Sequence, residues 1–229
     1  MRWIEYWDDK PTIYVGARHR DAHYRCVAEG LVSCLQPGDA VVLDYGCGEA
    51  LNAGIVASRL RRLYLCDAAP SVRAELSRRF AGNPAVTVVA PEELSGIAEG
   101  SIDLVVANSV IQYLSAEVLD GCLDDWKRLV QPRGRIVLAD VIPRGVGPLT
   151  DAAALLRFAA REGFLLAAVA GLVRTFFSPY RTIRAKLGLT QLDEAEVIAM
   201  LAGKGLAATR VHPNLGHNQA RMAFEARPR

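Results

Sequence analysis

The sequence lacks paired cysteines, a strong net charge and any long apolar run, and each absence excludes a class of protein. Its five cysteines are scattered and include no C-x-x-C pair: Cys26, Cys34, Cys47, Cys66 and Cys122. This argues against a disulfide framework and a zinc site, so we expect no bound metal and a reducing, cytoplasmic location. The formal net charge of +2 over 229 residues does not favour nucleic-acid binding, although local basic patches stay open.

The longest apolar run is FLLAAVAGLV, at residues 164–173. It has about half of the roughly 20 residues that a transmembrane helix needs, so we expect no transmembrane segment. The run can still lie against a membrane surface or an apolar ligand, which leaves peripheral membrane contact open. The first ten residues, MRWIEYWDDK, are charged and aromatic where a signal peptide carries an apolar segment, so secretion is not expected.

What the sequence does contain is enough apolar material for a large core, at 51% of residues. The length fits one domain with or without an insertion. Strand-like and helix-like segments alternate, which predicts a parallel sheet covered by helices on both faces. We expect strands at residues 40–45, 62–67, 85–90, 102–107, 135–141, 207–212 and 220–226.

The connections between these strands are mostly helical. We expect helices to begin near Leu51, Pro70, Pro91, Ser115 and Asp193. The stretch QPRG, at residues 131–134, reads as the turn that returns the chain to the sheet. The last two strands have no helix between them, so they should pair antiparallel as a hairpin.

The first expected strand ends in an unusual way, in VVLDYGCGEALNAG at residues 41–54. Gly46 and Gly48 allow a sharp turn and a close approach of the backbone to a ligand, and free N–H groups before a helix attract negative charge. A cofactor with a carboxylate or phosphate would suit this turn. The first strand of an open parallel sheet lies beside the crevice where such ligands bind.

A nicotinamide cofactor fits this turn less well. The dinucleotide pattern G-x-G-x-x-G requires glycine at position 51, where this chain has Leu51. Asp44 would repel a pyrophosphate and suits a cationic amino group instead. Asp67 ends the second strand about 20 residues after Gly48, where a carboxylate can accept hydrogen bonds from both hydroxyls of a ribose.

These features together resemble the class I S-adenosylmethionine-dependent methyltransferases, in particular the small-molecule branch. The resemblance covers residues 38–142 closely and the final strands loosely. The segments that carry it are residues 41–48, Asp67, GSIDLVVANSVIQYL at 100–114 and LVQPRGRIVLADV at 129–141. It implies a Rossmann-like methyltransferase fold: a seven-stranded, mostly parallel sheet with an antiparallel C-terminal hairpin, helices on both faces and a helical insertion after strand 5.

The resemblance also implies which residues hold the cofactor: Asp44, Gly46, Cys47, Gly48, Asp67, Ala68, Glu92, Asn108 and Ser109. The two glycines would pass beneath S-adenosylmethionine, Asp67 would hold its ribose, and Asn108 and Ser109 would lie where its methionine part meets the methyl acceptor. The sequence departs from the commoner pattern at Ala90, where an acid usually holds the adenine amino group. That leaves Glu92 or a backbone carbonyl for this role.

The implied activity is in-line methyl transfer, with S-adenosylhomocysteine as product. The donor is already activated, so a general base is needed only if the acceptor is protonated. The candidates for the base are His217, His19 and Asp140, with His23 as a further one. The residues expected to contact the substrate are Tyr14, His23, Gln112, Tyr113 and Arg157.

A small, partly hydrophobic or lipid-like acceptor is expected. Asn108 is not followed by the two prolines that accompany amine methylation of nucleic-acid bases in this superfamily, and the sequence shows no RNA-binding appendage. The alternatives are an NAD(P)-dependent oxidoreductase and a non-catalytic module on the same fold. The oligomeric state is open between monomer and homodimer.

We divide the chain into four parts: an N-terminal helical segment (1–37), the cofactor-binding core (38–142), a helical insertion (143–190) and a C-terminal part that completes the sheet (191–229). The N-terminal segment is either a lid over the cofactor or a helix pair packed on the sheet. In the insertion we expect helices at 152–170 and 178–189. Its six basic residues form either a solvated face or a lid over an anionic or amphipathic substrate: Arg157, Arg161, Arg174, Arg181, Arg184 and Lys186.

Overall fold

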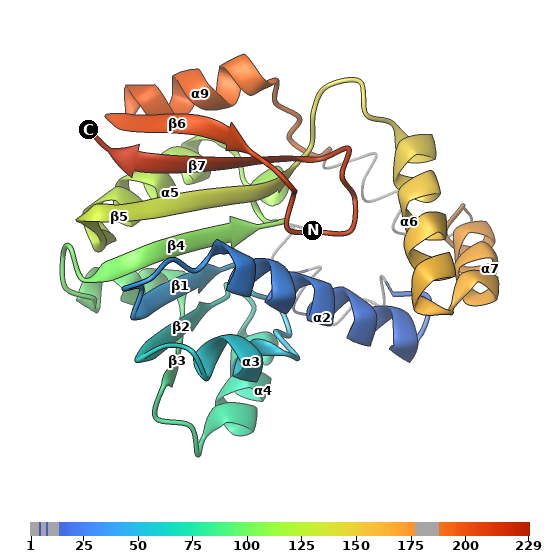
Figure 1. Cartoon of the computed structure of the whole chain (residues 1–229), viewed down its shortest axis with the longest axis horizontal. Helices are drawn as coiled ribbons and strands as arrows, with labels where there is room; N and C mark the ends of the chain where they lie inside the picture. The colour runs from blue at the N-terminus through green and yellow to red at the C-terminus, as the bar shows by residue number, and fades with distance from the viewer. Residues whose placement is uncertain (1–4, 6–7, 9–13, 177–187) are drawn as a thin grey trace.

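Seven strands form one sheet in a computed structural model that describes Glu5, Asp8 and residues 14–176 and 188–229 (Figure 1). The order across the sheet is β3-β2-β1-β4-β5-β7-β6. β1 to β5 pair in parallel, whereas β7 pairs antiparallel with both β5 and β6. The strands are β1 (Val41–Tyr45), β2 (Arg62–Cys66), β3 (Val86–Val89), β4 (Ile102–Asn108), β5 (Val130–Val141), β6 (Leu206–Val211) and β7 (Met222–Pro228). The predicted fold class is confirmed.

The helices lie on both faces of this sheet. The described α-helices are α2 (Ala17–Cys34), α3 (Ala53–Ala57), α4 (Pro70–Phe80), α5 (Ala116–Leu129), α6 (Pro148–Glu162), α7 (Leu165–Phe176) and α9 (Glu194–Gly203). Two short 3-10 helices are η1 (Pro91–Gly96) and η2 (Ile111–Tyr113). In Figure 1, α2 crosses in front of the sheet and α5 lies behind it.

The core has two layers because neighbouring residues of a buried strand point to opposite faces. Leu43 and Val105 pack with Leu123 and Trp126 of α5 and with Leu201 of α9. The residues next to them, Val42 and Val106, pack on the other face, with buried side chains of α2, α3 and α4. The sheet is therefore buried on both sides, and only its edges and strand ends are free to form a site.

The expected turn at residues 131–134 is wrong, because these residues lie inside β5. The register between β4 and β5 shifts there, from Ile102 opposite Val130 to Leu104 opposite Arg135. A Cβ atom on Gly134 would lie 2.8 Å from the backbone oxygen of Asp103. The chain thus passes this point as an irregular part of the strand, pressed against β4.

Two expected helices also differ from the structure. The helix expected at Pro91 is only the short 3-10 helix η1. At its N-terminus, the N–H of Ala90 donates to Glu93 Oε2 over 2.6 Å. The helix expected at 152–170 is two helices, because Gly163 ends α6 with a φ of +76°. The helix expected at 178–189 falls mostly outside the described residues.

The insertion lies beyond the carboxyl ends of the parallel strands, where α6 and α7 form a helical pair (Figure 1). It packs on α2 through a small apolar cluster: Ala22, Phe158, Ala159, Phe164 and Ala168. Among the described helices, none has the length and apolarity that a bilayer-crossing segment requires.

Candidate functional site

The glycine turn after β1 is built so that only glycine fits at two positions. Gly46 and Gly48 have φ angles of +70° and +57°, a region that other residues rarely adopt. A Cβ atom on Gly46 would lie 2.5 Å from Val110 Cγ2, and one on Gly48 would lie 3.0 Å from the Tyr24 hydroxyl. Val110 and Tyr24 thus pack so closely on the turn that a side chain at either position would have to displace them.

The N–H groups of this turn are not free, which corrects the expectation that they attract a negative ligand group. Those of Gly46 and Cys47 donate to the Cys66 carbonyl over 2.8 and 3.1 Å. The N–H of Gly48 donates to Asp67 Oδ2 over 2.9 Å, and that of Glu49 donates to the Tyr24 hydroxyl over 3.0 Å. The glycines supply the sharp turn and its close packing against Val110 and Tyr24, rather than donors for a ligand.

Asp67 lies directly after β2 and is fixed by backbone donors. Its Oδ2 accepts from Gly48 and its Oδ1 accepts from the N–H of Ala69 over 2.9 Å. Burial raises the pKa of this carboxyl, while the two N–H donors and Arg73 act in the opposite direction. Arg73 also donates to the carbonyl oxygens of Asp67 and Ala68, each over 2.8 Å. Each carboxylate oxygen keeps a lone pair for a further donor.

Asp44, in β1, is 5% exposed. Burial, followed by repulsion from Asp67, raises the pKa of this carboxyl to about 7. Within residues 14–176 and 188–229 no hydrogen bond reaches this carboxylate. A buried carboxylate is costly unless a cation or donor approaches it, so Asp44 suits a positively charged group.

Two buried acceptors at the end of β4 also lack partners. Asn108 is 9% exposed and Gln112 is 5% exposed. Asn108 Oδ1 and Gln112 Oε1 accept no hydrogen bond from the described part of the chain. A buried acceptor without a donor costs free energy, so both atoms are suited to bind a donor from a ligand.

Asp140, near the end of β5, is held from several sides. Ser109 Oγ donates to its Oδ2 over 2.7 Å, and Asn214 Nδ2 donates to its Oδ1 over 3.2 Å. Ser109 and Asp140 both have left-handed backbones, with φ angles of +57° and +59°, which is strain that functional sites often carry. Burial raises the pKa of Asp140, while Arg221, Ser109, Asn214 and His217 act to lower it.

The three predicted histidines lie among aromatic rings, and one of them, His217, also faces this acid. His217 stacks on Phe158, with ring centroids 4.6 Å apart, and lies 6.4 Å from His23. His19 stacks on Phe164 at 5.0 Å. Burial lowers the pKa of His19 to about 4 and that of His23 to about 3, and it also lowers the pKa of His217. All three imidazoles are therefore neutral at pH 7.

The N-terminal part of the chain covers the glycine turn. The Tyr24 hydroxyl, from α2, accepts the N–H of Glu49, and Arg20 pairs with the Glu49 carboxylate over 3.3 Å. Further upstream, Asp8 Oδ1 accepts the N–H of Ser71 over 2.8 Å, at the start of α4 near Asp67. Tyr14 lies 5.5 Å from His23 and 5.9 Å from Tyr24 between ring centroids. The segment both packs on the sheet, through Ala28 and Leu31, and reaches the site.

Several predicted residues are not drawn into this arrangement. Glu92 is exposed in η1, and its carbonyl accepts from Ser95. Arg157 is exposed on α6 and donates to the Ala153 carbonyl of its own helix. Two others do lie within it. Tyr113, half-buried in η2, is near enough to Tyr14 to raise the pKa of that phenol, and the Cys47 thiol, in the glycine turn, has a pKa raised well above its usual value, chiefly by burial. A reactive thiolate at Cys47 is therefore excluded.

The geometry makes two further residues important: Asn214, which was missed, and Tyr24, which was expected only as one of the aromatic residues of the N-terminal segment. Tyr24 carries only the signal of an aromatic residue before the core. Asn214 also receives the N–H of Asp140 at its Oδ1 over 2.8 Å, although the two residues are 74 positions apart in the chain. No local pattern could have revealed that contact.

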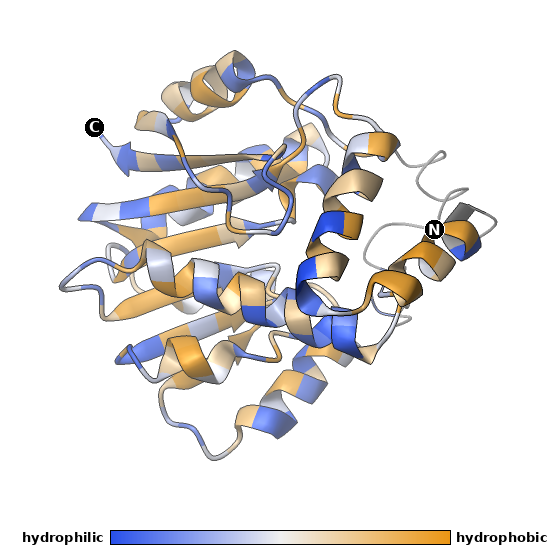
Figure 2. Ribbon diagram, turned by 45° about the vertical axis from the view of Figure 1, so that its right-hand side comes forward, coloured by the Kyte–Doolittle hydropathy of each residue, from blue (hydrophilic) through white to orange (hydrophobic). Residues whose placement is uncertain are grey.

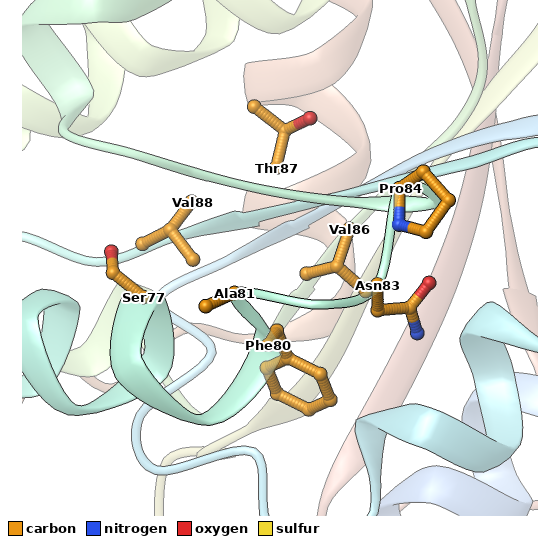
Figure 3. A pocket seen from close by; sticks show the side chains of 8 residues that line it. All are labelled: Ser77, Phe80, Ala81, Asn83, Pro84, Val86, Thr87 and Val88. Carbon is orange, nitrogen blue, oxygen red and sulfur yellow. The ribbon is translucent and has the colours of Figure 1, made fainter.

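A separate hollow of about 370 Å³ lies between α4 and the edge strand β3 (Figure 3). Its lining residues are Ser77, Phe80, Ala81, Asn83, Pro84, Val86, Thr87 and Val88. The last turn of α4 and the loop before β3 lie at the amino end of that strand. This hollow is thus at the opposite end of the sheet from Asp44, Asp67 and Asp140. Within the described residues no group of three or more His, Cys, Asp or Glu side chains is arranged to hold a metal.

The sheet order, the glycine turn and the acid after β2 are those of the Rossmann-like fold of class I methyltransferases. Its site also fits the cofactor of that class: Asp67 offers acceptors at the end of β2, and Asn108 and Gln112 have unpaired buried oxygens. Residues 43–138 match a family model described as a methyltransferase domain. The chain therefore carries a methyltransferase domain over these residues, and S-adenosylmethionine is the cofactor that its site fits.

Solved structures show the same fold at low sequence identity. Magnesium protoporphyrin IX methyltransferase from Synechocystis PCC 6803, with bound S-adenosylhomocysteine, is 18% identical, with a TM-score of 0.59 over 100% of this chain and 93% of that one. The YcgJ protein from Bacillus subtilis is 15% identical, with a TM-score of 0.58 over 83% and 71% of the two chains.

Phosphoethanolamine N-methyltransferase 1 from Haemonchus contortus, with phosphoethanolamine and S-adenosylhomocysteine, is 22% identical, with a TM-score of 0.51. That likeness covers 61% of this chain and 31% of the longer one. No curated protein matches the sequence.

Proposed function

We propose that this enzyme methylates a small, partly hydrophobic or lipid-like acceptor at the carboxyl ends of β4 and β5. The observation that carries the proposal is the arrangement around Asp140. Ser109 and Asn214 hold its two oxygens, and the neutral imidazole of His217 is near enough to affect its pKa. An acid beside a neutral histidine is a suitable general base for a hydroxyl or amine acceptor.

The cofactor would be held by residues of three neighbouring strands. Asp67 accepts hydrogen bonds from the ribose hydroxyls at the lone pairs that Gly48 and Ala69 leave free. Asp44 and the side-chain oxygen of Asn108 attract the ammonium group. The backbone of Gly46, Cys47 and Gly48 lies beside the nucleoside and Ala68. The adenine amino group donates to a backbone carbonyl or to Glu92, which would have to turn inward from its exposed position in η1.

S-adenosylmethionine supplies a methyl group on a positively charged sulfur that is already activated for transfer. The protein therefore mainly has to hold the acceptor in line and exclude water. His217 accepts the acceptor's proton at an imidazole nitrogen, and Asp140 stabilises the resulting imidazolium. Phe158 fixes the ring plane by stacking on it. General bases of this kind contribute about 10²- to 10⁴-fold in rate.

The other two histidines have different surroundings. His19 is 7% exposed, and its Nδ1 accepts the N–H of Val15 over 3.3 Å. We therefore assign it to packing, within the apolar cluster between α2 and α6. His23, Tyr14 and Gln112 contact the acceptor in this proposal, with Tyr113 beside them and Arg157 at the rim. The apolar side chains of α6 and α7 favour an acceptor with a hydrophobic part. Two of the similar solved structures are enzymes named for their substrates, and both substrates are small molecules: a magnesium protoporphyrin and phosphoethanolamine.

The test is a labelling experiment with three forms of the full chain: the natural protein, His217→Gln and Asp140→Asn. Each is incubated with methyl-labelled S-adenosylmethionine and metabolite extracts from cells without the gene. We expect a labelled small molecule with the natural protein and at least a hundredfold slower labelling with either variant, with cofactor affinity unchanged. Equal rates for all three would contradict the role of Asp140 and His217, and label only in protein or nucleic acid would contradict the substrate class.

A further inference from the structure

Helix α7 exposes an apolar face that no described part of the chain covers. Leu166 is 87% exposed, Val173 59%, Val169 48% and Leu165 41%. With about 100° of rotation per residue, these four positions fall within roughly a 100° arc of the helix surface. Figure 2 shows α7 as a mostly hydrophobic helix at the outer side of the molecule.

The orientation of this face is fixed by the packing on the other side of α7. Ala168 is fully buried in the cluster with Phe158 and Phe164. A Cβ atom on Gly171 would lie 2.1 Å from Val15 Cγ1, so the segment before α2 lies directly against the helix at that point. Since the small residues face inward, the larger leucine and valine side chains must face outward.

The surroundings of this face are basic. Arg174 is exposed on α7 and Arg157 on α6, whereas Arg161, also exposed on α6, pairs with Glu162 over 3.2 Å. The two carboxylates of this helical pair are occupied: Asp151 pairs with Arg221 over 2.7 Å, and Glu162 pairs with Arg25 over 2.7 Å. The sequence from 163 to 192 contains no acidic residue. An apolar helix face with arginines and no free acid is typical of segments that lie in the interface of an anionic membrane.

We propose that α7 is a membrane-docking surface that binds peripherally to anionic phospholipid, with Leu165, Leu166, Val169 and Val173 in the interface. A second copy of the chain fits this surface less well, because a symmetric contact through it would bring the same arginines together. The helix lies on the side of the sheet where the strands' carboxyl ends are (Figure 1). The enzyme would therefore bind the membrane with its site toward the bilayer. The docking itself does not depend on which acceptor is methylated.

The test is flotation of the full chain with two kinds of vesicle, phosphatidylcholine alone and phosphatidylcholine mixed with phosphatidylglycerol. We expect binding to the mixed vesicles and at least tenfold weaker binding to the neutral ones. Val169→Glu should weaken binding to the mixed vesicles at least tenfold, and Arg174→Glu should reduce the preference for the anionic lipid several-fold.

Val118→Glu is the matched control. Val118 is 51% exposed in the first turn of α5, so the same change of charge is made at a similar exposure away from α7. It should bind vesicles like the natural protein. Equal binding by the Val169 and Val118 variants would overturn the proposal. Absence of binding to both kinds of vesicle would also overturn the proposal. If light scattering then shows a dimer that Val169→Glu dissociates and Val118→Glu does not, the face binds a second copy of the chain instead.

Discussion

The Asp44 carboxyl has a pKa of about 7, far above the usual value for an aspartate, because it is buried and Asp67 repels its charge. The ionised form is the one that attracts a cationic cofactor. Protonation as the pH falls through 7 therefore removes an attraction that is fully present above pH 7. The effect on stability has the opposite sign. Because folding raises the pKa of Asp44, ionisation of this carboxyl as the pH rises lowers the free energy of unfolding of the protein without cofactor.

We predict that S-adenosylmethionine binds about tenfold more weakly at pH 6 than at pH 8, as expected for one group titrating near 7. Calorimetric titration across this range measures the effect. Asp44→Asn should bind weakly at both pH values, with little change between them. A flat profile for the natural protein would show that Asp44 is not the group that faces the cation.

Tyr24 connects α2 to the glycine turn through a single hydroxyl. Tyr24→Phe leaves the N–H of Glu49 without its acceptor, which costs about 1–3 kcal/mol if the group stays buried. We predict this loss in urea unfolding, together with weaker cofactor binding. Tyr64→Phe serves as the control, since Tyr64 is half-buried in β2, and it should change stability by less than about 0.5 kcal/mol. If Tyr24→Phe is as stable as Tyr64→Phe, the Tyr24 hydroxyl does not link α2 to the glycine turn.

At the scale of elements, two helical glycines have opposite roles. Gly171, in α7, lies against Val15, whereas Gly121, in α5, has nothing within 4 Å of a Cβ atom. Overpacking at the first position costs about 1–3 kcal/mol. Replacing glycine by alanine in an open helix interior gains about 0.5–1 kcal/mol.

Gly171→Ala should therefore lower the melting temperature by several degrees and Gly121→Ala should raise it by a few. Scanning calorimetry of the two variants measures both shifts. If both variants are stabilised, α7 does not pack against the N-terminal segment as described.

The sequence predicted most elements because buried parallel strands are short apolar runs bounded by turn residues, as in VVLDY and IDLVVAN. It failed where a distant contact decides the local shape. Gly134 approaches the backbone of β4, so QPRG continues the strand rather than turning. Gly163 divides a run of helical composition into α6 and α7, and composition alone did not show which glycine would end the helix.

At the scale of the whole molecule, the site combines predicted and unpredicted parts. Asp67 and Gly48 were expected at neighbouring strand ends, and they are in direct contact. Asn214 reaches Asp140 from the β6–β7 connection, which only the folded sheet brings together. The amides of the glycine turn could not be assigned from the sequence either, because their acceptors come from two separate segments: Cys66 and Asp67 at the end of β2, and Tyr24 in α2.

The central claim is that Asp67 and the glycine turn form the binding site for S-adenosylmethionine, and titration calorimetry of the full chain tests it most directly. The natural protein should bind both S-adenosylmethionine and S-adenosylhomocysteine. The control variant Asp21→Asn, changed on the exposed surface of α2, should bind each ligand as tightly as the natural protein does. Asp67→Asn should bind about a hundredfold more weakly, because one of the two acceptor oxygens is replaced by a donor and the other loses its negative charge. No heat with the natural protein, or unchanged affinity in Asp67→Asn, would contradict the account.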